Sequence, residues 1–273
     1  MPEATFTVVT PCKNSGRLLR ATIESVLRQT AIVSGRARLE YTVVDGASLD
    51  DTVSVARATG DIRVISEPDR GMYDALAKGL QAGSGDVYCY LNAGDLFAAT
   101  AFDVVLDVLA DTRIQWLTGM NVNYNEKGQV TYARLPFRYR RSSIQNGLHG
   151  GRLPAVQQES TFWTASLQKA VDLEALRGYR LAGDHYLWST FARTADLYIV
   201  SSHLGGFCHH GEHLSVDYDR YLDEMTWHTR RPSPRERLVG EYDRLMWRAP
   251  DRLKKMANPD TLLRYDLAAR AWR

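Results

Sequence analysis

The sequence predicts an α/β fold in which a mostly parallel sheet carries helices on both faces and a helical C-terminal appendage follows. Strand-like and helix-like patterns alternate five times within about the first 120 residues, as in strand–helix–strand units with right-handed crossovers. The strand-like segments are short apolar runs that stop at turn residues, which is typical of buried parallel strands. After residue 214 the chain has a helical character interrupted by prolines.

Local patterns account for each element of the first half. Apolar runs with β-branched residues predict strands at 6–10, 41–44, 62–66, 87–91 and 114–118. Apolar residues at helical spacing predict the intervening helices, which begin at Asn14 or Ser15, near Thr52, at Gly71 and near Phe102. The strand at 87–91 stops abruptly at Asn92-Ala93-Gly94-Asp95.

In the second half, strand-like and helix-like patterns no longer alternate regularly. A four-residue turn between 121–124 and 129–133 predicts a β-hairpin. Further patterns predict helices over 165–176 and 184–194 and a late strand over 197–201. The remaining helical segments are expected to break at Pro232, Pro234, Pro250 and Pro259.

Composition narrows the class of protein. With 44% hydrophobic and 24% charged residues, the chain has ordinary globular usage. It contains no apolar run long enough to span a bilayer and no N-terminal signal peptide, so a cytoplasmic location is expected, with contact at the inner face of the membrane left open. The three widely spaced cysteines argue against a disulfide framework.

Basic residues are distributed unevenly despite a net charge of only +2. Residues 127–158 contain six Lys or Arg residues and no acid, and the tail from Arg220 onward is also basic. Such surfaces attract phosphates or anionic lipid, and we expect these rather than nucleic acid. The tail, with Trp227, Trp247, Met246 and Trp272, is interpreted as resting on a membrane, packing a second subunit in a homo-oligomer, or doing neither.

Acidic residues follow several of the predicted strands: Asp45, the Glu67 and Asp69 pair, and Asp95. The carboxyl ends of parallel strands meet at one edge of a sheet, where open α/β folds bind their ligands. Asp50 is interpreted instead as a helix cap. The first strand runs into Pro11-Cys12-Lys13-Asn14, and neither a dinucleotide-binding nor a P-loop glycine motif is present. NAD and P-loop ATP chemistry are therefore excluded.

Four blocks follow one another in the first half: Val9-Thr10-Pro11-Cys12-Lys13-Asn14, similar to "hxxPxxN"; residues 43–52, similar to "VVDDGSTDGT"; residues 66–79, similar to "sExDxGiYdAxNKG"; and Leu91-Asn92-Ala93-Gly94-Asp95, at the place of a DXD motif. In this order the blocks resemble family 2 glycosyltransferases with the GT-A fold. The resemblance implies a GT-A domain over 1–214, with a nucleotide-sugar half at 1–118 and an acceptor half at 119–214. A helical extension would follow at 215–273.

The resemblance also implies the roles of individual residues. It places Asp45, Pro11 and Asn14 at the nucleobase, Asp69, Arg70 and Lys78 at the ribose or diphosphate, and Asn92, Ala93 and Gly94 in the same nucleotide-sugar site. Asp95 would hold Mg²⁺ or Mn²⁺. Asn92 and Gly94 stand where relatives often have aspartates, which leaves one clear carboxylate. One suffices in principle, because Mg²⁺ commonly uses one or two carboxylates together with substrate phosphates.

The second half is expected to supply the acceptor site. Residues 178–188 resemble the family segment whose aspartate is the general base, which implies that role for Asp184. Without the resemblance, Asp184 would be interpreted as a helix cap. Residues 157–162 resemble the family's "HQxxFf" segment, with Gln157 replacing the histidine. Gln158 and Glu159 are therefore candidate acceptor-side residues, although Glu159 is equally interpreted as the partner of an arginine.

A histidine cluster, His209-His210-Gly211-Glu212-His213, leaves a second hypothesis open. It satisfies the H-x-x-E-H pattern of some zinc hydrolases, in which His209, Glu212 and His213 would act on a helix. The neighbouring glycines indicate a loop instead, and the position resembles the family's glycine-rich loop. In that case His209 or His213 is a further candidate for the metal or diphosphate, and packing histidines are an equal alternative.

The predicted function is therefore metal-assisted, inverting transfer of a sugar, of the hexosyltransferase type. The donor would be a nucleotide-diphosphate sugar, with a UDP-sugar favoured, and the acceptor a hydroxyl of a glycan or lipid-linked glycan of the bacterial cell envelope. Lys78 or basic residues such as Arg138 to Arg141 would help to neutralise the departing diphosphate. The alternatives are the zinc hydrolase and a non-catalytic nucleotide-sugar-binding protein.

Overall fold

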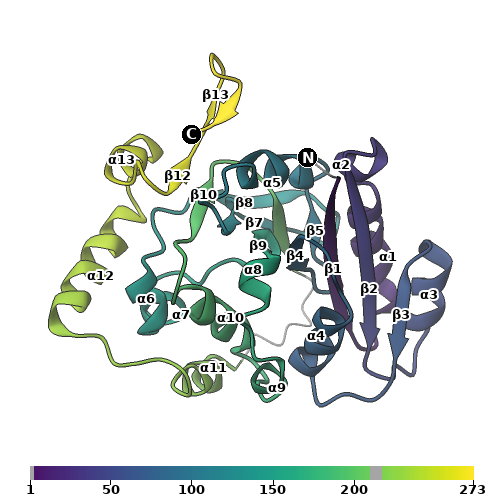
Figure 1. The fold of residues 1–273 in the computed structure, drawn as a ribbon. Coiled ribbons are helices and arrows are strands. Elements are labelled where there is room, and N and C mark those ends of the chain that lie inside the picture. The colour runs from purple at the N-terminus through teal and green to yellow at the C-terminus, as the bar shows by residue number, and fades with distance from the viewer. Residues whose placement is uncertain (1–2, 210–216) are drawn as a thin grey trace.

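A computed structural model describes residues 3–209 and 217–273 of the chain. Within this part, the central sheet has eight strands in the order β12-β10-β6-β9-β4-β1-β2-β3, flanked by helices (Figure 1). The strands are β1 (Ala4–Cys12), β2 (Ala37–Asp45), β3 (Arg63–Ser66), β4 (Val87–Tyr90), β6 (Trp116–Thr118), β9 (Thr161–Thr164), β10 (Tyr198–Val200) and β12 (Leu262–Leu263). The predicted mixed α/β architecture is confirmed.

The first half of the sheet places the carboxyl ends of its strands together. Strand β1 pairs in parallel with β2 and with β4, and its register sets Cys12 opposite Asp45. Asp45 in turn lies opposite Ser66 on β3. The predicted crossover helices are present as α1 (Gly16–Leu27), α3 (Thr52–Thr59), α4 (Met72–Gln81) and α5 (Ala101–Leu109), with a short α2 (Thr30–Val33) before β2.

Strand β9 makes the sheet mixed. It lies between β4 and β6 and pairs antiparallel with both. Its Trp163 is fully buried and packs against Trp188 and Phe191 of α10 (Gly183–Phe191). The buried indoles explain the insertion, because a large apolar area is removed from water at the centre of the sheet. This strand was not predicted as an element of the sheet.

A second sheet of four strands, in the order β5-β11-β7-β8, lies beside the first. Its members are β5 (Leu96–Phe97), β11 (Gly205–Cys208), β7 (Asn121–Tyr124) and β8 (Val130–Arg134). The predicted hairpin is the β7–β8 pair. The short segments between β8 and α10 are α6 (Arg141–Gln145), α7 (Leu148–Gly151), η1 (Gln158–Ser160), α8 (Ala165–Gln168) and α9 (Leu173–Leu176). The helix predicted over 165–176 is thus two single turns.

The C-terminal part contains α11 (Tyr218–Met225), α12 (Pro234–Met246) and α13 (Asp251–Ala257). Pro234 opens α12 inside a capping box of Ser233 and Glu236, since a proline suits the first turn of a helix. Three short strands were not predicted: β12, which joins the main sheet, and the hairpin of β13 (Tyr265–Asp266) and β14 (Ala271–Trp272). No helix in the described ranges is long and apolar enough to cross a bilayer.

Arginines of the acid-free stretch bind protein groups and do not line the cleft described below, contrary to the expectation that they help to neutralise a diphosphate. Arg140 forms an ion pair with the fully buried Asp243 of α12. Arg138 donates to the Asn258 side chain, and Arg141 donates to the Ala192 carbonyl at the end of α10. The apparent excess of charge in this stretch is therefore partly internal, and it attaches the C-terminal helices to the rest of the chain.

Candidate active site

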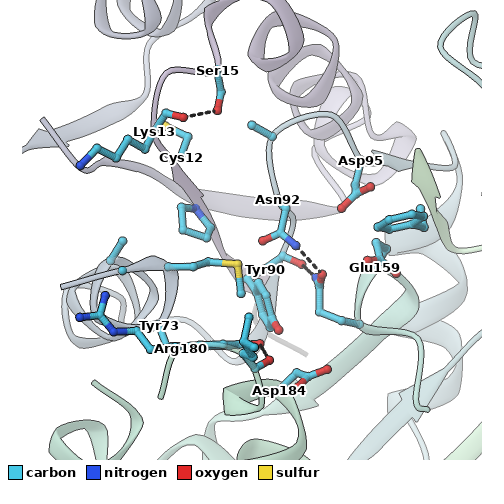
Figure 2. A pocket seen from close by; sticks show the side chains of 18 of the residues that line it. Cys12, Lys13, Ser15, Tyr73, Tyr90, Asn92, Asp95, Glu159, Arg180 and Asp184 are labelled. Carbon is cyan, nitrogen blue, oxygen red and sulfur yellow. Dashed lines mark hydrogen bonds between the residues drawn. The ribbon is translucent and has the colours of Figure 1, made fainter. Parts of the chain in front are cut away.

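A cleft of about 730 Å³ opens at the carboxyl ends of β1 and β4. Figure 2 shows Cys12, Lys13 and Ser15, from the end of β1 and the segment after it, on one side, and Glu159 of η1 and Asp184 at the start of α10 on the other. Residues of α11 also line the cleft. Nine of the predicted site residues line it: Pro11, Asn14, Asp69, Asn92, Ala93, Asp95, Gln158, Glu159 and Asp184. Segments distant in sequence are thus brought to one place by the strand order.

The segment after β1 is held in a specific conformation. Asn14 has a positive φ of 50°, which asparagine tolerates better than most residues. Its side-chain oxygen accepts from the backbone N–H of Leu49, and its own N–H donates to the Ser48 hydroxyl. These bonds connect the loop after β1 to the loop after β2.

Besides His209, four predicted residues lie outside the cleft lining. Asp45 is fully buried and accepts from the Ser66 hydroxyl at 2.7 Å and from the backbone N–H of Ser48 at 3.1 Å. Lys78 pairs with Glu67 at 2.9 Å and donates to the Pro68 carbonyl. Arg70 and Gly94 are also absent from the lining, and their expected contacts with a nucleotide remain predictions.

Asp69 is the acid of this region that reaches the cleft. It accepts from the backbone N–H of Gly71 at 2.9 Å, so its side chain is fixed by the turn that precedes α4. A β-carbon added to Gly46 would come within 2.4 Å of the Asp69 carboxylate. A larger residue at position 46 would therefore displace the Asp69 carboxylate from its present position.

The exit of β4 brings polar oxygen atoms to the centre of the cleft. Asp95 is almost fully buried, and its Oδ1 accepts from the backbone N–H of Cys208 at 2.8 Å. The Asn92 amide nitrogen donates to Gln158 at 3.2 Å, while its buried Oδ1 has no hydrogen-bond partner in the described structure. Gly94 has a φ of 106°, a conformation that favours glycine and aims the following Asp95.

Residues of η1 form the wall opposite β1. Gln158 donates to the Tyr90 carbonyl at 2.5 Å, and Gln157 bonds the backbone of Val122 through both ends of its amide. Gln157 therefore ties η1 to β7. Burial raises the pKa of Glu159 to about 7, with the charge of Asp184 acting in the same direction. No arginine pairs with Glu159 among the described residues.

Asp184 is the second residue of α10, and the helix cap is Ala182. The interpretation of Asp184 as the N-cap is therefore wrong. Its carboxylate faces the cleft beside Tyr73 (Figure 2). Burial raises its pKa to about 6, against the hydrogen bond from the His185 N–H and the nearby Tyr73 and Tyr221 hydroxyls, which favour the charged form. A buried carboxylate with a pKa near neutrality is suited to accept a proton.

Burial and the neighbouring Glu159 charge also raise the pKa of Asp95 well above its usual range. Asp95, Glu159 and Asp184 thus surround the cleft with three carboxylates whose charge is poorly solvated. Such an arrangement is electrostatically unfavourable when empty. It favours the binding of a cation or of hydroxyl groups that donate hydrogen bonds.

Several lining residues were not predicted as site residues: Tyr73, Arg180, Asp217, Tyr218 and Tyr221. Tyr73 lies inside the block of residues 66–79, so the sequence could have identified it as a site residue. The residues of α11 lie in the tail, where no motif pointed to them. Their presence means that the C-terminal part contributes to the wall of the cleft.

The histidine cluster is described only in part. His209 is exposed, follows β11, and its backbone N–H donates to the Tyr124 carbonyl. His210, Glu212 and His213 lie outside the described residues. Within the described ranges, no group of three or more His, Cys, Asp or Glu residues is placed to hold a metal ion.

Comparison with known proteins identifies the family. The model of "Glycosyl transferase family 2" matches residues 7–155. The chain belongs to this family. An uncharacterized glycosyltransferase of Mycobacterium tuberculosis (strain ATCC 25618 / H37Rv) is 36% identical over 96 residues, or 34% of this chain and 35% of the relative. A "PGL/p-HBAD biosynthesis glycosyltransferase" of Mycobacterium bovis (strain BCG / Pasteur 1173P2) is 30% identical over 100 residues, or 35% and 37% of the two chains. The matches span about a third of the length of these curated relatives.

Solved structures confirm the GT-A fold of this family 2 chain. Residues 1–349 of S. aureus TarS in complex with UDP-GlcNAc have a TM-score of 0.61 at 12% identity, and the match covers 93% of this chain and 73% of that TarS fragment. M. tuberculosis glucosyl-3-phosphoglycerate synthase, in complex with Mn²⁺, UDP and phosphoglyceric acid, has a TM-score of 0.56 at 19% identity, covering 85% and 80%. At these identities the likeness concerns the fold.

The donor atoms around Asp95 fit a divalent cation. Asp95, Glu159 and Asn92 present carboxylate and amide oxygens to one cleft, and such hard oxygen ligands suit Mg²⁺ and Mn²⁺. The unpartnered Asn92 Oδ1 is an acceptor that a cation or a donor group would satisfy. Asn92, at a position where relatives often have an aspartate, thus supplies a neutral amide oxygen.

Proposed function

We propose that the protein transfers a sugar from a nucleotide-diphosphate sugar to an acceptor hydroxyl with inversion at the anomeric carbon. The observation that carries the proposal is the position of Asp184, a buried carboxylate with a pKa of about 6 that shares one cleft with Asp95. A base on one side of the cleft and an oxygen-rich end on the other, where a cation could offset the charge of the diphosphate, are what a single displacement needs.

The donor end is proposed to be the side formed by Pro11, Asn14, Asp69 and the β4 exit. A UDP-sugar is the favoured donor, and the TarS and phosphoglycerate synthase complexes, which contain UDP-GlcNAc and UDP, support this choice. We propose the division of the chain as residues 1–118 for the nucleotide sugar, 119–214 for the acceptor, and 215–273 as a mainly helical extension, which also adds β12 to the main sheet.

Asp95 and Asn92 would hold Mg²⁺ or Mn²⁺, with His209 or His213 as further candidates. When bound, the ion would offset the negative charge of the diphosphate. Asp184 would accept the proton of the acceptor hydroxyl while its oxygen forms a bond to the anomeric carbon. The bond from that carbon to the diphosphate oxygen would break in the same step, and its electron pair would leave with the nucleoside diphosphate. General-base assistance of this kind contributes roughly 10²–10⁴-fold to the rate.

The acceptor is proposed to be a hydroxyl of a glycan or lipid-linked glycan. Gln158, Glu159 and the tyrosines of α4 and α11 line the acceptor side of the cleft. Carboxylates and tyrosine hydroxyls accept hydrogen bonds from sugar hydroxyls, and aromatic faces supply apolar contact. A named relative that takes part in PGL/p-HBAD biosynthesis is consistent with such an acceptor.

The experiment is a panel of UDP-, GDP- and TDP-sugars with Mg²⁺ or Mn²⁺, monitored by the melting temperature and then by transfer to glycan and lipid-linked acceptors. A rise in the melting temperature with one donor and the metal, followed by transfer that inverts the anomeric centre, is expected. Binding without transfer or donor hydrolysis under every condition would instead identify a non-catalytic nucleotide-sugar-binding protein.

A further inference from the structure

The most buried acid of α11 lies directly behind the candidate base. Glu224 has 3% of its surface exposed, and its Oε2 accepts from the backbone N–H groups of Arg180 at 3.0 Å, Leu181 at 2.8 Å and Ala182 at 3.0 Å. Its other oxygen lies 3.3 Å from the same Arg180 N–H. One carboxylate thus binds three consecutive peptide N–H groups.

These three residues immediately precede α10, and Asp184 follows two residues after Ala182. A carboxylate that accepts several N–H bonds fixes the orientation of each peptide that donates to it. The opposite side of the segment is fixed as well, because the Tyr73 hydroxyl donates to the Leu181 carbonyl. A β-carbon on Gly183 would come within 2.4 Å of the Tyr73 ring, so little free space remains there.

The same helix contacts the base itself. Tyr221 lies one turn before Glu224 on α11, lines the cleft, and is close enough to Asp184 that, besides burial, the Asp184 charge helps to raise its pKa. Residues three apart on a helix share a face, so Tyr221 and Glu224 approach the start of α10 together. Helix α11 belongs to the extension beyond the residues that the family model matches.

We propose that Glu224 is a positioning residue for glycosyl transfer: its carboxylate holds residues 180–182 so that Asp184 points at the acceptor. This inference rests on the proposed function and assigns a role to α11 within it. A displacement of about 1 Å at a reacting group can cost on the order of 10²-fold in rate. Loss of the Glu224 charge should therefore lower kcat without weakening the donor site, which lies across the cleft.

The test compares Glu224→Gln with Asp223→Asn, a matched control in which an exposed neighbouring acid on the same helix is neutralised. We expect Glu224→Gln to lower kcat by roughly 10–100-fold while the donor Kd changes less than about threefold. Asp223→Asn should resemble the parent protein. If Glu224→Gln does not fold, Glu224→Asp takes its place, since it keeps the charge on a shorter side chain. A parental kcat in the folded variant, or equal losses in kcat and donor affinity, would overturn the proposal.

A double-mutant cycle separates positioning from general structural damage. If Glu224 acts through Asp184, Glu224→Gln should cost little more once Asp184→Asn is present. If the loss of kcat in the double variant equals the product of the two single losses, the positioning role is refuted. If Asp184→Asn alone retains the transfer activity of the parent protein, the proposed base is wrong. If Asp184→Asn is inactive but Glu224→Gln has the activity of the parent protein, only the positioning role of Glu224 is wrong.

A separate observation concerns the outer face of the C-terminal helices. On α12, Gly240, Asp243 and Trp247 at its end face inward and are buried. Leu238, Tyr242 and Leu245 recur at the spacing of one helical face and are exposed by 73%, 48% and 62%. Helix α12 runs along the edge of the molecule, away from the sheet (Figure 1).

Helix α13, which follows α12, also exposes apolar residues, and basic residues accompany them. Leu253 and Met256 of α13 are exposed by 48% and 69%. Exposed arginines in the same region form no ion pair within the described part of the chain: Arg235, Arg237, Arg248 and Arg252. An apolar helix face bordered by unpaired arginines is complementary to a layer of anionic headgroups above acyl chains.

We infer that this face, formed by α12 and α13, binds the surface of a membrane that contains anionic lipid. A second copy of the chain would bring the arginines of both copies toward one another, and charge complementarity therefore favours the lipid surface. The inference does not depend on catalysis.

Flotation with vesicles of phosphatidylcholine and phosphatidylglycerol, against phosphatidylcholine alone, tests the inference. Binding to the anionic vesicles that falls at least tenfold in the Leu238→Ser, Leu245→Ser double variant is expected. Leu49→Ser, which removes another highly exposed leucine, 96% exposed on the loop after β2, should bind like the parent protein. Absence of binding, or a dimer in light scattering that the double variant abolishes, would overturn the inference.

Discussion

The Oδ1 atom of Asp95 accepts a 2.8 Å hydrogen bond from the backbone N–H of Cys208. This bond joins the segment after β4 to the end of β11. Asp95 is the only carboxylate among residues 92–95, which stand at the place of the DXD motif, and the bond occupies one of its two oxygens. The other oxygen and the unpartnered Asn92 Oδ1 are left to face the cleft. Asparagine at a position where relatives often have an aspartate therefore keeps an oxygen acceptor but carries no charge.

Asp95→Asn is expected to weaken metal-dependent binding of UDP at least tenfold, because it leaves two neutral amides where a cation needs negative charge. Isothermal titration of UDP with and without Mn²⁺ measures the effect. Asp86→Asn, at the opposite end of β4, is the control and should bind like the parent protein. Equal UDP affinity of Asp95→Asn and the parent in the presence of Mn²⁺ would exclude Asp95 as a ligand.

Asp184→Asn should remove transfer by a factor of about 10² or more and leave donor binding unchanged. It should also stabilise the protein. The folded-state pKa of about 6 lies above the ordinary value of 3.8, so the charged carboxylate costs stability above pH 6, by up to about 3 kcal/mol. A neutral amide avoids that cost, and the melting temperature at pH 8 should rise. Robust transfer by this variant would refute the assignment of the base.

The activity of the parent protein should fall as the pH drops through about 6, because Asp184 must be unprotonated to accept a proton. Glu159, whose pKa is raised to about 7 by burial and by the charge of Asp184, titrates in the same range and should broaden the transition. A kcat–pH profile at saturating donor and metal measures this. A profile that stays flat down to pH 5 would contradict a buried base at this position.

The fold of the first half was predictable because each strand and helix there carries its own pattern. Strands buried on both faces read as continuous apolar runs, and their register brings Asp69 and Asp95 to one edge. The antiparallel insertion of β9 had no such signal. Its place is decided by the packing of Trp163 against α10, and tertiary contacts of this kind are not visible in a local pattern.

The site was predictable where a sequence block coincides with a strand or helix end, as at Asp95 and Asp184. It was not predictable for α11, whose Tyr221 and Glu224 reach the start of α10 only through the folding of the tail. The expected phosphate role of Arg138 to Arg141 failed for a related reason. The composition of the segment shows that Arg140 is charged, but it does not show that Arg140 forms an ion pair with the buried Asp243, which is distant in sequence.

Gly183→Ala should impair both activity and stability. The added β-carbon would come within 2.4 Å of the Tyr73 ring, and overpacking of this kind typically costs about 1–3 kcal/mol. Because Asp184 is the next residue, we also expect a lower kcat. Gly151→Ala is the control, since its nearest neighbour, Leu222, lies 4.0 Å away. Parental kcat and melting temperature in Gly183→Ala would mean that Tyr73 can move without consequence.

Arg140→Met should destabilise the whole chain, because it leaves the fully buried Asp243 without its cation. Removing one partner of a buried ion pair costs about 3–5 kcal/mol. Arg140 lies just before α6 and Asp243 on α12, so the pair attaches the C-terminal helices to the domain. The control is Arg244→Met, which breaks a surface pair with Glu241 and should cost less than about 1 kcal/mol. Urea unfolding followed by tryptophan fluorescence measures both. If α12 were only loosely attached, the two variants would unfold at the same urea concentration, whereas a large difference would mean that the extension and the domain unfold together.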